Sequence, residues 1–162
     1  MTFYFFIFKF TILVNNVEAL DPRKGKIHKA TDQELVETTN INTFPMVMMN
    51  RFLGPQMLAR GRDRSGIINM TSYYVDWPIY SLPIFTASKA MQAQTSYIFG
   101  LEVEDEGLNV LTVKQMPVKT KRNPVGVEAE DIVEGVFNDL GKRRISYGHW
   151  KHSLLRYWIL WR

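Results

Sequence analysis

The stretch GIINMTSYYVDWPIYSLPIFTASKAM, residues 66–91, contains the residues that decide the fold. It begins with an apolar run, Gly66 to Ser72, which is typical of a buried strand. A loop with two prolines follows, and a long helix is predicted from about Phe85 to Glu104. Within that helix, three residues separate Phe85 from Lys89. A lysine at this distance usually serves a hydroxyl, so the spacing is either an accident of one helix face or a catalytic site that has lost its acid.

The rest of the chain also alternates between predicted strands and predicted helices. Further strands are predicted over residues 11–15, 108–114 and 144–147. Further helices are predicted over residues 31–60, with a kink at Pro45, and over residues 128–140, with an apolar stripe of Ile132, Val133, Val136, Phe137 and Leu140. This alternation predicts an α/β domain with a parallel sheet, in which sites form beyond the carboxyl ends of the strands.

The composition indicates one globular domain. The chain has 162 residues, of which 46% are hydrophobic and 22% are charged, and its formal net charge is +4. The basic residues are scattered, so a nucleic-acid partner is not expected. The chain has no cysteine, which excludes disulfides, thiolate metal sites and a cysteine nucleophile.

Both ends of the chain are rich in aromatic residues. We divide the chain into an aromatic N-terminal segment (1–10), a domain (11–150) and an aromatic, basic tail (151–162). The apolar run from Phe3 to Val14 is shorter than the roughly 20 residues of a membrane-spanning helix. Its composition favours a strand, and a membrane anchor is the alternative.

Several motifs between Ile12 and His152 resemble the C-terminal half of the short-chain dehydrogenase/reductase family. ILVNNV resembles the family's NNxG strand end, and NINTFPMV resembles the segment that places the active-site asparagine at Asn42. GIINMTS resembles the serine strand, with Ser72 thirteen residues before Phe85, and FTASK occupies the YxxxK motif. The branch that matches best contains the 17β-hydroxysteroid dehydrogenases and very-long-chain 3-oxoacyl-CoA reductases. The resemblance implies a truncated Rossmann-like parallel sheet with flanking helices.

The resemblance also implies a chemistry, the transfer of a hydride between NAD(P)H and a carbonyl group. In the family, the tyrosine donates the proton, the lysine lowers the pKa of that tyrosine and holds the cofactor ribose, the serine binds the carbonyl oxygen, and the asparagine keeps a water. By position, Asn42, Ser72 and Lys89 remain, and Phe85 replaces the tyrosine. The vestigial cofactor contacts would be Asn15, Asn16, Lys89 and Thr120. An inactive member of this branch, the hydroxysteroid dehydrogenase-like protein, also has phenylalanine in this motif.

Three departures from the family pattern count against a bound dinucleotide. The glycine-rich TGxxxGxG turn, expected on a βαβ half before Ile12, is absent from the sequence. The glycine of NNxG is Glu18, whose carboxylate would repel phosphate. The loop that closes over the nicotinamide, PGxxxT in the family, is contracted to Pro117–Thr120. No cofactor is therefore expected, and NADP(H) would be the cofactor if the protein were active.

Three hypotheses about function follow. The first is a catalytically inactive dehydrogenase-like protein that acts as a structural or interaction subunit of a larger complex. The second is an NADP(H)-dependent reductase of ketosteroids or 3-oxoacyl-CoA whose cofactor-binding half is missing from this chain. The third is a protein held at a membrane surface by its aromatic ends. The resemblance suggests the mitochondrion for the inactive member and the endoplasmic reticulum membrane for its branch.

The expected partners are a protein or a second copy of the chain. They would bind the open sheet edge at residues 11–15 and the helices over residues 46–60 and 85–104, which correspond to the pair through which the family usually dimerises. An apolar, unpaired edge favours association.

Simpler structural roles are the alternative for each candidate residue. Phe85 fits a plain core aromatic, Lys89 a solvated helix residue, Ser72 a strand-end serine and Asn42 a side chain that satisfies backbone groups near Pro45. An alternative source of the missing hydroxyl is a tyrosine of the loop, namely Tyr73, Tyr74 or Tyr80. His149 and His152 are predicted to be a surface pair, and no metal site is expected.

Overall fold

The sheet of this protein has four strands, and all of them are parallel. A computed structural model describes residues 10–19, 26–61, 65–121 and 123–160, and the first nine residues of the aromatic N-terminal segment lie outside this description. The strands lie in the order β1 (Ile12–Asn15), β2 (Gly66–Ser72), β3 (Asn109–Gln115) and β4 (Ile145–Ser146). This sheet confirms the predicted α/β fold with parallel strands.

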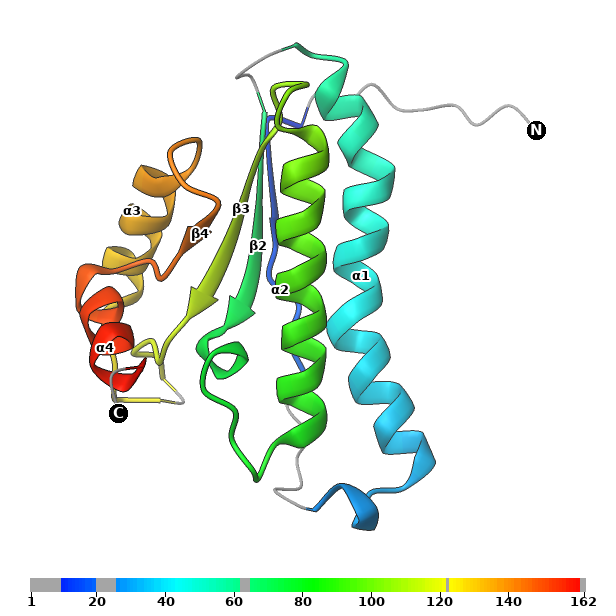
Figure 1. Ribbon diagram of the computed structural model, residues 1–162, viewed down its shortest axis with the longest axis vertical. Helices are drawn as coiled ribbons and strands as arrows, with labels where there is room; N and C mark the ends of the chain where they lie inside the picture. The colour runs from blue at the N-terminus through cyan, green and yellow to red at the C-terminus, as the bar shows by residue number, and fades with distance from the viewer. Residues whose placement is uncertain (1–9, 20–25, 62–64, 122, 161–162) are drawn as a thin grey trace.

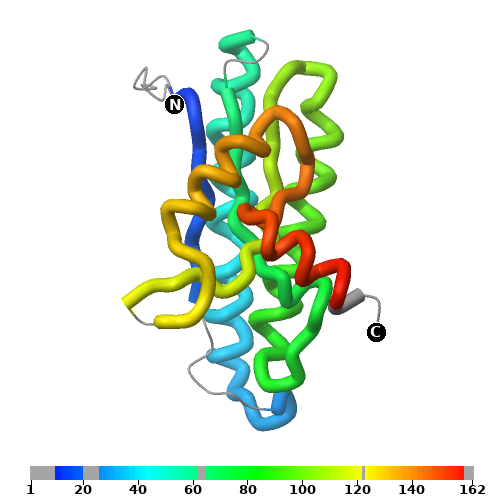
Figure 2. Tube along the Cα trace, turned by 90° about the vertical axis from the view of Figure 1, so that its left-hand side faces the viewer, coloured from blue at the N-terminus to red at the C-terminus, as the bar shows by residue number. Residues whose placement is uncertain are grey.

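Helices cover the sheet on both faces. Long helices α1 (Asp32–Leu58) and α2 (Pro83–Val103) pack against each other on one face, and α3 (Ala129–Asp139) covers the other. A last helix, α4 (Trp150–Leu160), follows β4. Figure 1 shows α1 and α2 side by side, with α3 and α4 on the far side of the strands, and Figure 2 gives the view from that side.

Alternate residues of the strands fill two separate cores, because successive side chains of a strand point to opposite faces. Ile67 and Val110 face α1 and α2, where they pack with Met57 and Val103. Ile68, Leu111 and Val113 face α3, where they pack with Ile132 and Val136. Each such fully buried aliphatic side chain stabilises the fold by about 1.5–3 kcal/mol.

The start of α1 has the side chains that a helix N-terminus requires. Thr31 accepts a hydrogen bond from the backbone N–H of Glu34, whose carboxylate accepts one from the N–H of Thr31. This reciprocal pair satisfies two of the backbone donors that have no partner within the helix. Asp32 adds a negative charge in the first turn, where the helix dipole favours it.

A row of hydrogen-bonded polar side chains crosses the sheet beneath α1 and α2. The Nδ2 of Asn15 on β1 donates to Asn50 of α1 at 2.9 Å and to Asn69 of β2 at 2.7 Å. Asn69 in turn donates to Ser96 of α2 at 2.9 Å, and Ser96 shares a hydrogen bond with Thr112 of β3 at 2.6 Å. Asn15, Asn69 and Thr112 are direct neighbours in the strand register. We call these five residues the polar row.

One expectation from the sequence was wrong. The apolar stripe of α3 is narrower than predicted, because Ile132 and Val136 are buried, whereas Val133 and Phe137 are exposed. The apolar residue type alone does not decide which of these side chains the sheet covers. Most of the aromatic, basic tail, for which no secondary structure is predicted, belongs to α4.

None of the helices in the described part of the chain is both long enough and apolar enough to cross a membrane.

Helix α3 and the turn after β4 approach each other without room for a side chain. A Cβ atom built on Gly135 would lie 1.7 Å from the carbonyl oxygen of Gly148. Gly148 itself has φ +72°, a conformation that favours glycine. The backbone contact between these two glycines therefore sets the distance between α3 and the start of α4.

Replacing Gly135 with alanine is expected to lower the free energy of unfolding by about 2 kcal/mol or more, because the new methyl group can be accommodated only by moving backbone. Urea unfolding of purified protein measures this change. The matched control is Gly100→Ala in α2, whose Cβ would make an ordinary contact 3.4 Å from the Val110 side chain. Alanine favours a helix interior over glycine, so the control should be neutral or stabilising. Equal stability of the two variants would contradict the tight contact.

Candidate active site

The candidate site lies where the chain leaves β1 and where α2 begins. Phe85 is in the first turn of α2, and Lys89 follows one turn later. Both side chains are buried, with 2% of Phe85 and 1% of Lys89 exposed. The interpretation of Lys89 as a solvated helix residue is therefore wrong, whereas Phe85 has the burial of a core aromatic.

Asn42 of α1 holds the segment that follows β1. Its Oδ1 accepts a hydrogen bond from the backbone N–H of Ala19 at 2.8 Å, and its Nδ2 donates to the carbonyl of the same residue at 2.9 Å. Asn42 is completely buried. The side chain does satisfy backbone groups, but they belong to Ala19 and not to the helix near Pro45. These two hydrogen bonds fix the position of Ala19 and therefore of the preceding residue, Glu18.

Glu18 forms an ion pair with Lys89. Its Oε2 lies 3.2 Å from the Lys89 Nζ, and the carboxylate side chain is 46% exposed. Burial lowers the pKa of Lys89, and the charge and hydrogen bond of Glu18 oppose that effect. The carboxylate at the position of the family glycine thus compensates a desolvated ammonium. The sequence shows Glu18 to be unusual, but the pairing itself depends on the fold.

The Phe85 ring contacts both a cation and a second aromatic ring. The Lys89 Nζ lies 5.6 Å from the Phe85 ring centroid, within the range of a cation–π contact. The Tyr74 ring meets Phe85 edge-to-face at a centroid distance of 6.3 Å. A phenyl ring in this position packs well and has no proton to donate.

Ser72 ends β2, and its hydroxyl oxygen serves the backbone. The Oγ accepts a hydrogen bond from the N–H of Tyr74 at 3.2 Å and so caps the 3-10 turn η2 (Tyr73–Val75). Burial, followed by a hydrogen bond with Tyr74, raises the pKa of Tyr73. A tyrosine with a raised pKa is a weaker acid, which makes Tyr73 a poor substitute for the missing hydroxyl. Tyr80 is almost fully exposed.

The other residues expected to contact a cofactor are dispersed. Asn15 belongs to the polar row, where its amide binds Asn50 and Asn69 in the interior. Asn16 is exposed immediately after β1. Thr120 is exposed in the loop after β3, where its backbone N–H and its hydroxyl bind Asn123. Of the predicted cofactor contacts, the structure places only Lys89 in the candidate site.

A second polar cluster, which the sequence analysis missed, joins η2 to the C-terminal elements. Asp76 accepts hydrogen bonds from Lys114 Nζ of β3 at 2.6 Å and from the Tyr147 hydroxyl at 2.7 Å. The Arg156 guanidinium of α4 lies 5.2 Å from the Tyr147 ring centroid. Asp76 is 38 residues from Lys114 and 71 residues from Tyr147 in the sequence, so only the fold shows that they meet.

The two histidines do not form the predicted surface pair. His152 is buried, and its Nδ1 is 3.1 Å from the Tyr147 carbonyl oxygen, which makes it the donor. Burial lowers the pKa of His152, so the neutral imidazole is favoured. Among the residues that the structure describes, no three acidic, histidine or cysteine side chains gather in a way that could hold a metal ion.

The order of the strands and helices agrees with comparisons to known proteins. The family model of the short chain dehydrogenases matches residues 7–130. The chain belongs to the short-chain dehydrogenase family. The match covers the candidate site and both long helices.

The family relatives include very-long-chain 3-oxoacyl-CoA reductases. That of Phaeosphaeria nodorum is 24% identical over 162 residues, which cover 92% of this chain and 47% of the relative. The reductase let-767 of Caenorhabditis elegans is 29% identical over 152 residues, which cover 88% of this chain and 47% of the relative. The chain therefore spans about half the length of the curated relatives that it matches.

Solved structures of the short-chain dehydrogenase family share the fold. A 7β-hydroxysteroid dehydrogenase superposes with a TM-score of 0.81 and 17% identity, over 91% of this chain and 60% of that one. A short chain dehydrogenase of Burkholderia cenocepacia in complex with NADP gives a TM-score of 0.76 and 21% identity, over 93% of this chain and 66% of that one. The predicted half-domain of a dehydrogenase is thus the observed architecture.

Replacing Glu18 with glutamine is expected to lower the free energy of unfolding by about 1–2 kcal/mol, because the Lys89 ammonium would remain buried without its countercharge. The expected loss is smaller than for a fully buried pair, since Glu18 is half exposed to water. Urea unfolding at neutral pH measures the change.

The control is Lys89→Met, which removes the buried charge itself and should leave stability equal or higher. Because the pKa of Lys89 is lowered on folding, the unfolded chain binds this proton more tightly. Stability therefore rises with pH between the folded pKa and the ordinary value, and Lys89→Met should flatten that rise. A Glu18→Gln protein as stable as the parent would show that the ion pair contributes nothing.

Proposed function

We propose that this protein is a catalytically inactive member of the short-chain dehydrogenase family that serves as an interaction subunit of a larger complex. The observation that carries the proposal is the state of Lys89. In the family, this lysine assists a tyrosine and holds the cofactor ribose. Here its ammonium is neutralised by Glu18 at 3.2 Å and faces the ring of Phe85.

Both changes weaken the family chemistry. Loss of a positioned general acid costs about 10² to 10⁴ in rate, and Phe85 supplies no proton. The Glu18 carboxylate opposes the approach of a phosphate group, since like charges in a low-dielectric site repel strongly. While the Lys89 ammonium is bound to Glu18, fewer of its N–H groups can donate hydrogen bonds to a ligand. The residues of the site therefore support a structural role over a catalytic one.

The sheet edge at β1 supports an interaction role. In the described part of the chain, β1 pairs only with β2, so its other edge has backbone groups available to a further strand. Val14 is 50% exposed, although it lies on the sheet face that α3 covers at Ile68 and Leu111. An apolar parallel edge of this kind favours a partner that completes the sheet.

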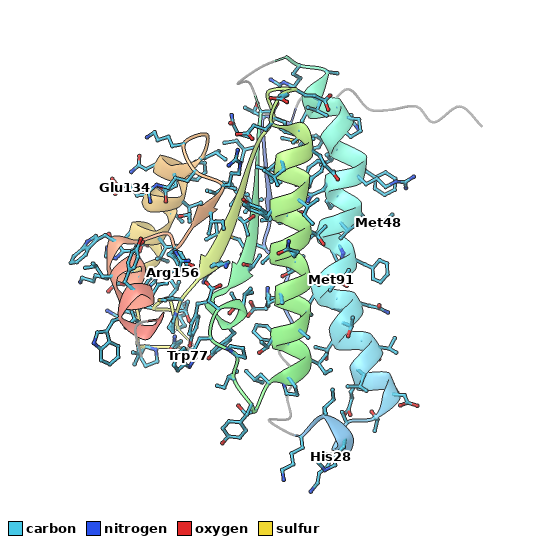
Figure 3. The ribbon with its side chains drawn as sticks, viewed as in Figure 1. His28, Met48, Trp77, Met91, Glu134 and Arg156 are labelled. Atoms are coloured by element: carbon cyan, nitrogen blue, oxygen red, sulfur yellow. The ribbon has the colours of Figure 1, made fainter. Side chains whose placement is uncertain are left out.

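The outer surfaces of α1 and α2 offer a second area for a protein partner or another copy of the chain. Exposed apolar side chains recur on α1 at helical spacing, at Ile41, Phe44, Met48 and Phe52. Helix α2 adds Met91 and Ile98, and Figure 3 labels Met48 and Met91 on the two neighbouring helices. An apolar surface of two packed helices suits a helix-to-helix interface.

The second candidate function is an NADP(H)-dependent reductase that works together with a separate cofactor-binding half. The observation that favours it is the retention of Asn42, Ser72 and Lys89, all buried near strand ends. The relatives are named very-long-chain 3-oxoacyl-CoA reductases, which makes 3-oxoacyl thioesters the substrates to test. NADP(H) would then be bound partly by Lys89, and another group would have to supply the proton.

Replacing Phe85 with tyrosine is expected to restore no NADPH-dependent reduction of ketones or 3-oxoacyl thioesters. The new hydroxyl would stand beside a lysine that Glu18 engages, and neither the parent nor the variant should bind NADPH. Fluorescence titration with NADPH and absorbance assays of NADPH consumption measure both properties. Turnover by Phe85→Tyr that disappears in Phe85→Tyr/Lys89→Met would establish the reductase alternative instead.

Expressed alone, the chain is expected to aggregate or elute as an oligomer, because its apolar edge and helix surfaces would remain uncovered. Replacing Val14 with lysine puts a charge on the edge strand and should shift the protein toward smaller species. Size-exclusion chromatography with light scattering measures the change. The matched control is Val125→Lys, at an exposed loop position before α3.

A parent protein that elutes as a monomer and unfolds cooperatively would refute the need for a partner. Equal effects of Val14→Lys and Val125→Lys would show that net charge, and not the β1 edge, governs association.

A further inference from the structure

The last helix, α4, exposes apolar side chains and turns polar side chains toward the protein. Trp150, Leu154 and Trp158 are one turn apart from each other, and about 60% of each side chain is exposed. Tyr157, between them, is equally exposed. A surface helix of a globular protein normally turns its apolar stripe toward the core. Here the apolar stripe faces outward, and we call these four residues the α4 stripe.

The polar side of α4 faces the protein and anchors the helix. The buried imidazole of His152 donates to the Tyr147 carbonyl oxygen at 3.1 Å. One turn later, Arg156 is half buried over the Tyr147 ring. The Tyr147 hydroxyl donates to Asp76, which also binds Lys114. Figure 3 shows Arg156 on the side of α4 toward the sheet. These contacts fix the rotation of α4 about its axis, so the fold itself holds the apolar stripe toward solvent.

The chemistry of the stripe differs from that of the other exposed apolar surface. The exposed residues of α1 and α2 are mainly aliphatic side chains, methionine and phenylalanine, which suit a dry contact between helices. The stripe is dominated by tryptophan and tyrosine, which combine an apolar ring with a polar group. Such side chains concentrate where hydrocarbon meets water, at the level of the lipid headgroups.

The charges on α4 fit the same surface. Between Trp150 and Leu160 the helix has no acidic residue, and of its two basic residues Arg156 faces the protein at Tyr147 and Lys151 faces solvent. Lys151 is exposed, and its ammonium lies 5.6 Å from the Trp150 ring centroid. A short helix with an aromatic stripe and an exposed lysine beside it favours contact with anionic headgroups, and its 11 residues are too few to span a bilayer.

We infer that the α4 stripe binds the interface of a lipid bilayer that contains anionic lipids, with α4 parallel to the membrane plane. The contact is expected to be strongest at the Tyr157 and Trp158 end. At the other end, Asp131 and Glu134 of α3 line a hollow together with Trp150. Their carboxylates would repel anionic headgroups there and would partly offset the attraction that the exposed Lys151, beside Trp150, supplies. This membrane contact does not depend on whether the dehydrogenase-like site is active.

The experiment uses the full chain and vesicles of phosphatidylcholine, with or without phosphatidylserine. Flotation measures binding, and quenching of tryptophan fluorescence by lipid brominated on its acyl chains reports whether the rings reach the boundary between headgroups and acyl chains. The parent should float with vesicles that contain phosphatidylserine and bind more weakly as salt increases. Binding to vesicles without phosphatidylserine should be weaker.

Variants separate the apolar and electrostatic parts of the contact. Leu154→Ser/Trp158→Ser should reduce the vesicle affinity about tenfold or more, because it removes two apolar side chains from the stripe. Lys151→Glu should reduce binding only when phosphatidylserine is present. The matched control is Phe52→Ser, which removes an equally exposed apolar side chain from α1 on the opposite face of the sheet. Circular dichroism verifies that each variant retains the fold.

Three results would overturn the inference. The first is a parent protein that does not float with phosphatidylserine vesicles. The second is a Leu154→Ser/Trp158→Ser variant that floats as well as the parent. The third is that same unchanged flotation together with a change of the variant's molecular mass without lipid, measured by light scattering. That outcome would show that a second copy of the chain covers the stripe.

Discussion

The polar row beneath α1 and α2 is the constraint on which the arrangement of this protein depends. Its side chains come from three strands and two helices, and each buried amide or hydroxyl in it needs a specific partner. Shifting a strand by one residue would turn its member of the row to the opposite face and leave buried polar groups unpaired. Apolar contacts are not directional and tolerate such shifts much better. The polar row therefore specifies the strand register, whereas the surrounding apolar core supplies most of the stability.

The same row determines where the candidate site residues point. Asn42 precedes Asn50 on α1 by about two helical turns, and Lys89 precedes Ser96 on α2 by about the same distance. Each pair therefore lies on one helix face. Once Asn50 and Ser96 are bound to the row, Asn42 must face Ala19, and Lys89 must face Glu18. The row thus accounts for the directions of Asn42 and Lys89, and the residue one turn before Lys89 is Phe85, which has no proton to donate.

Much of this fold was predictable because its signals are local. The GIINMTS strand and the spacing from Ser72 to Lys89 are visible within short windows of sequence. The Glu18–Lys89 pair and the burial of His152 were not predictable, since they join residues that only the fold brings together. One signal of the polar row is visible in the sequence and was overlooked. Three strands each end an apolar run with a polar residue, at Asn15, Asn69 and Thr112.

The parallel sheet has a consequence for the synthesis of the protein on the ribosome. Neighbouring residues of β1 and β2, such as Asn15 and Asn69, are 54 positions apart in the chain. At a synthesis rate of about 5 to 20 residues per second, β1 waits about 3 to 10 s for the strand beside it to be made. Helices can form within microseconds, whereas parallel pairing must wait for translation. For this short interval, the nascent β1 is an apolar strand without its native neighbour, and nascent-chain chaperones have the time to bind it.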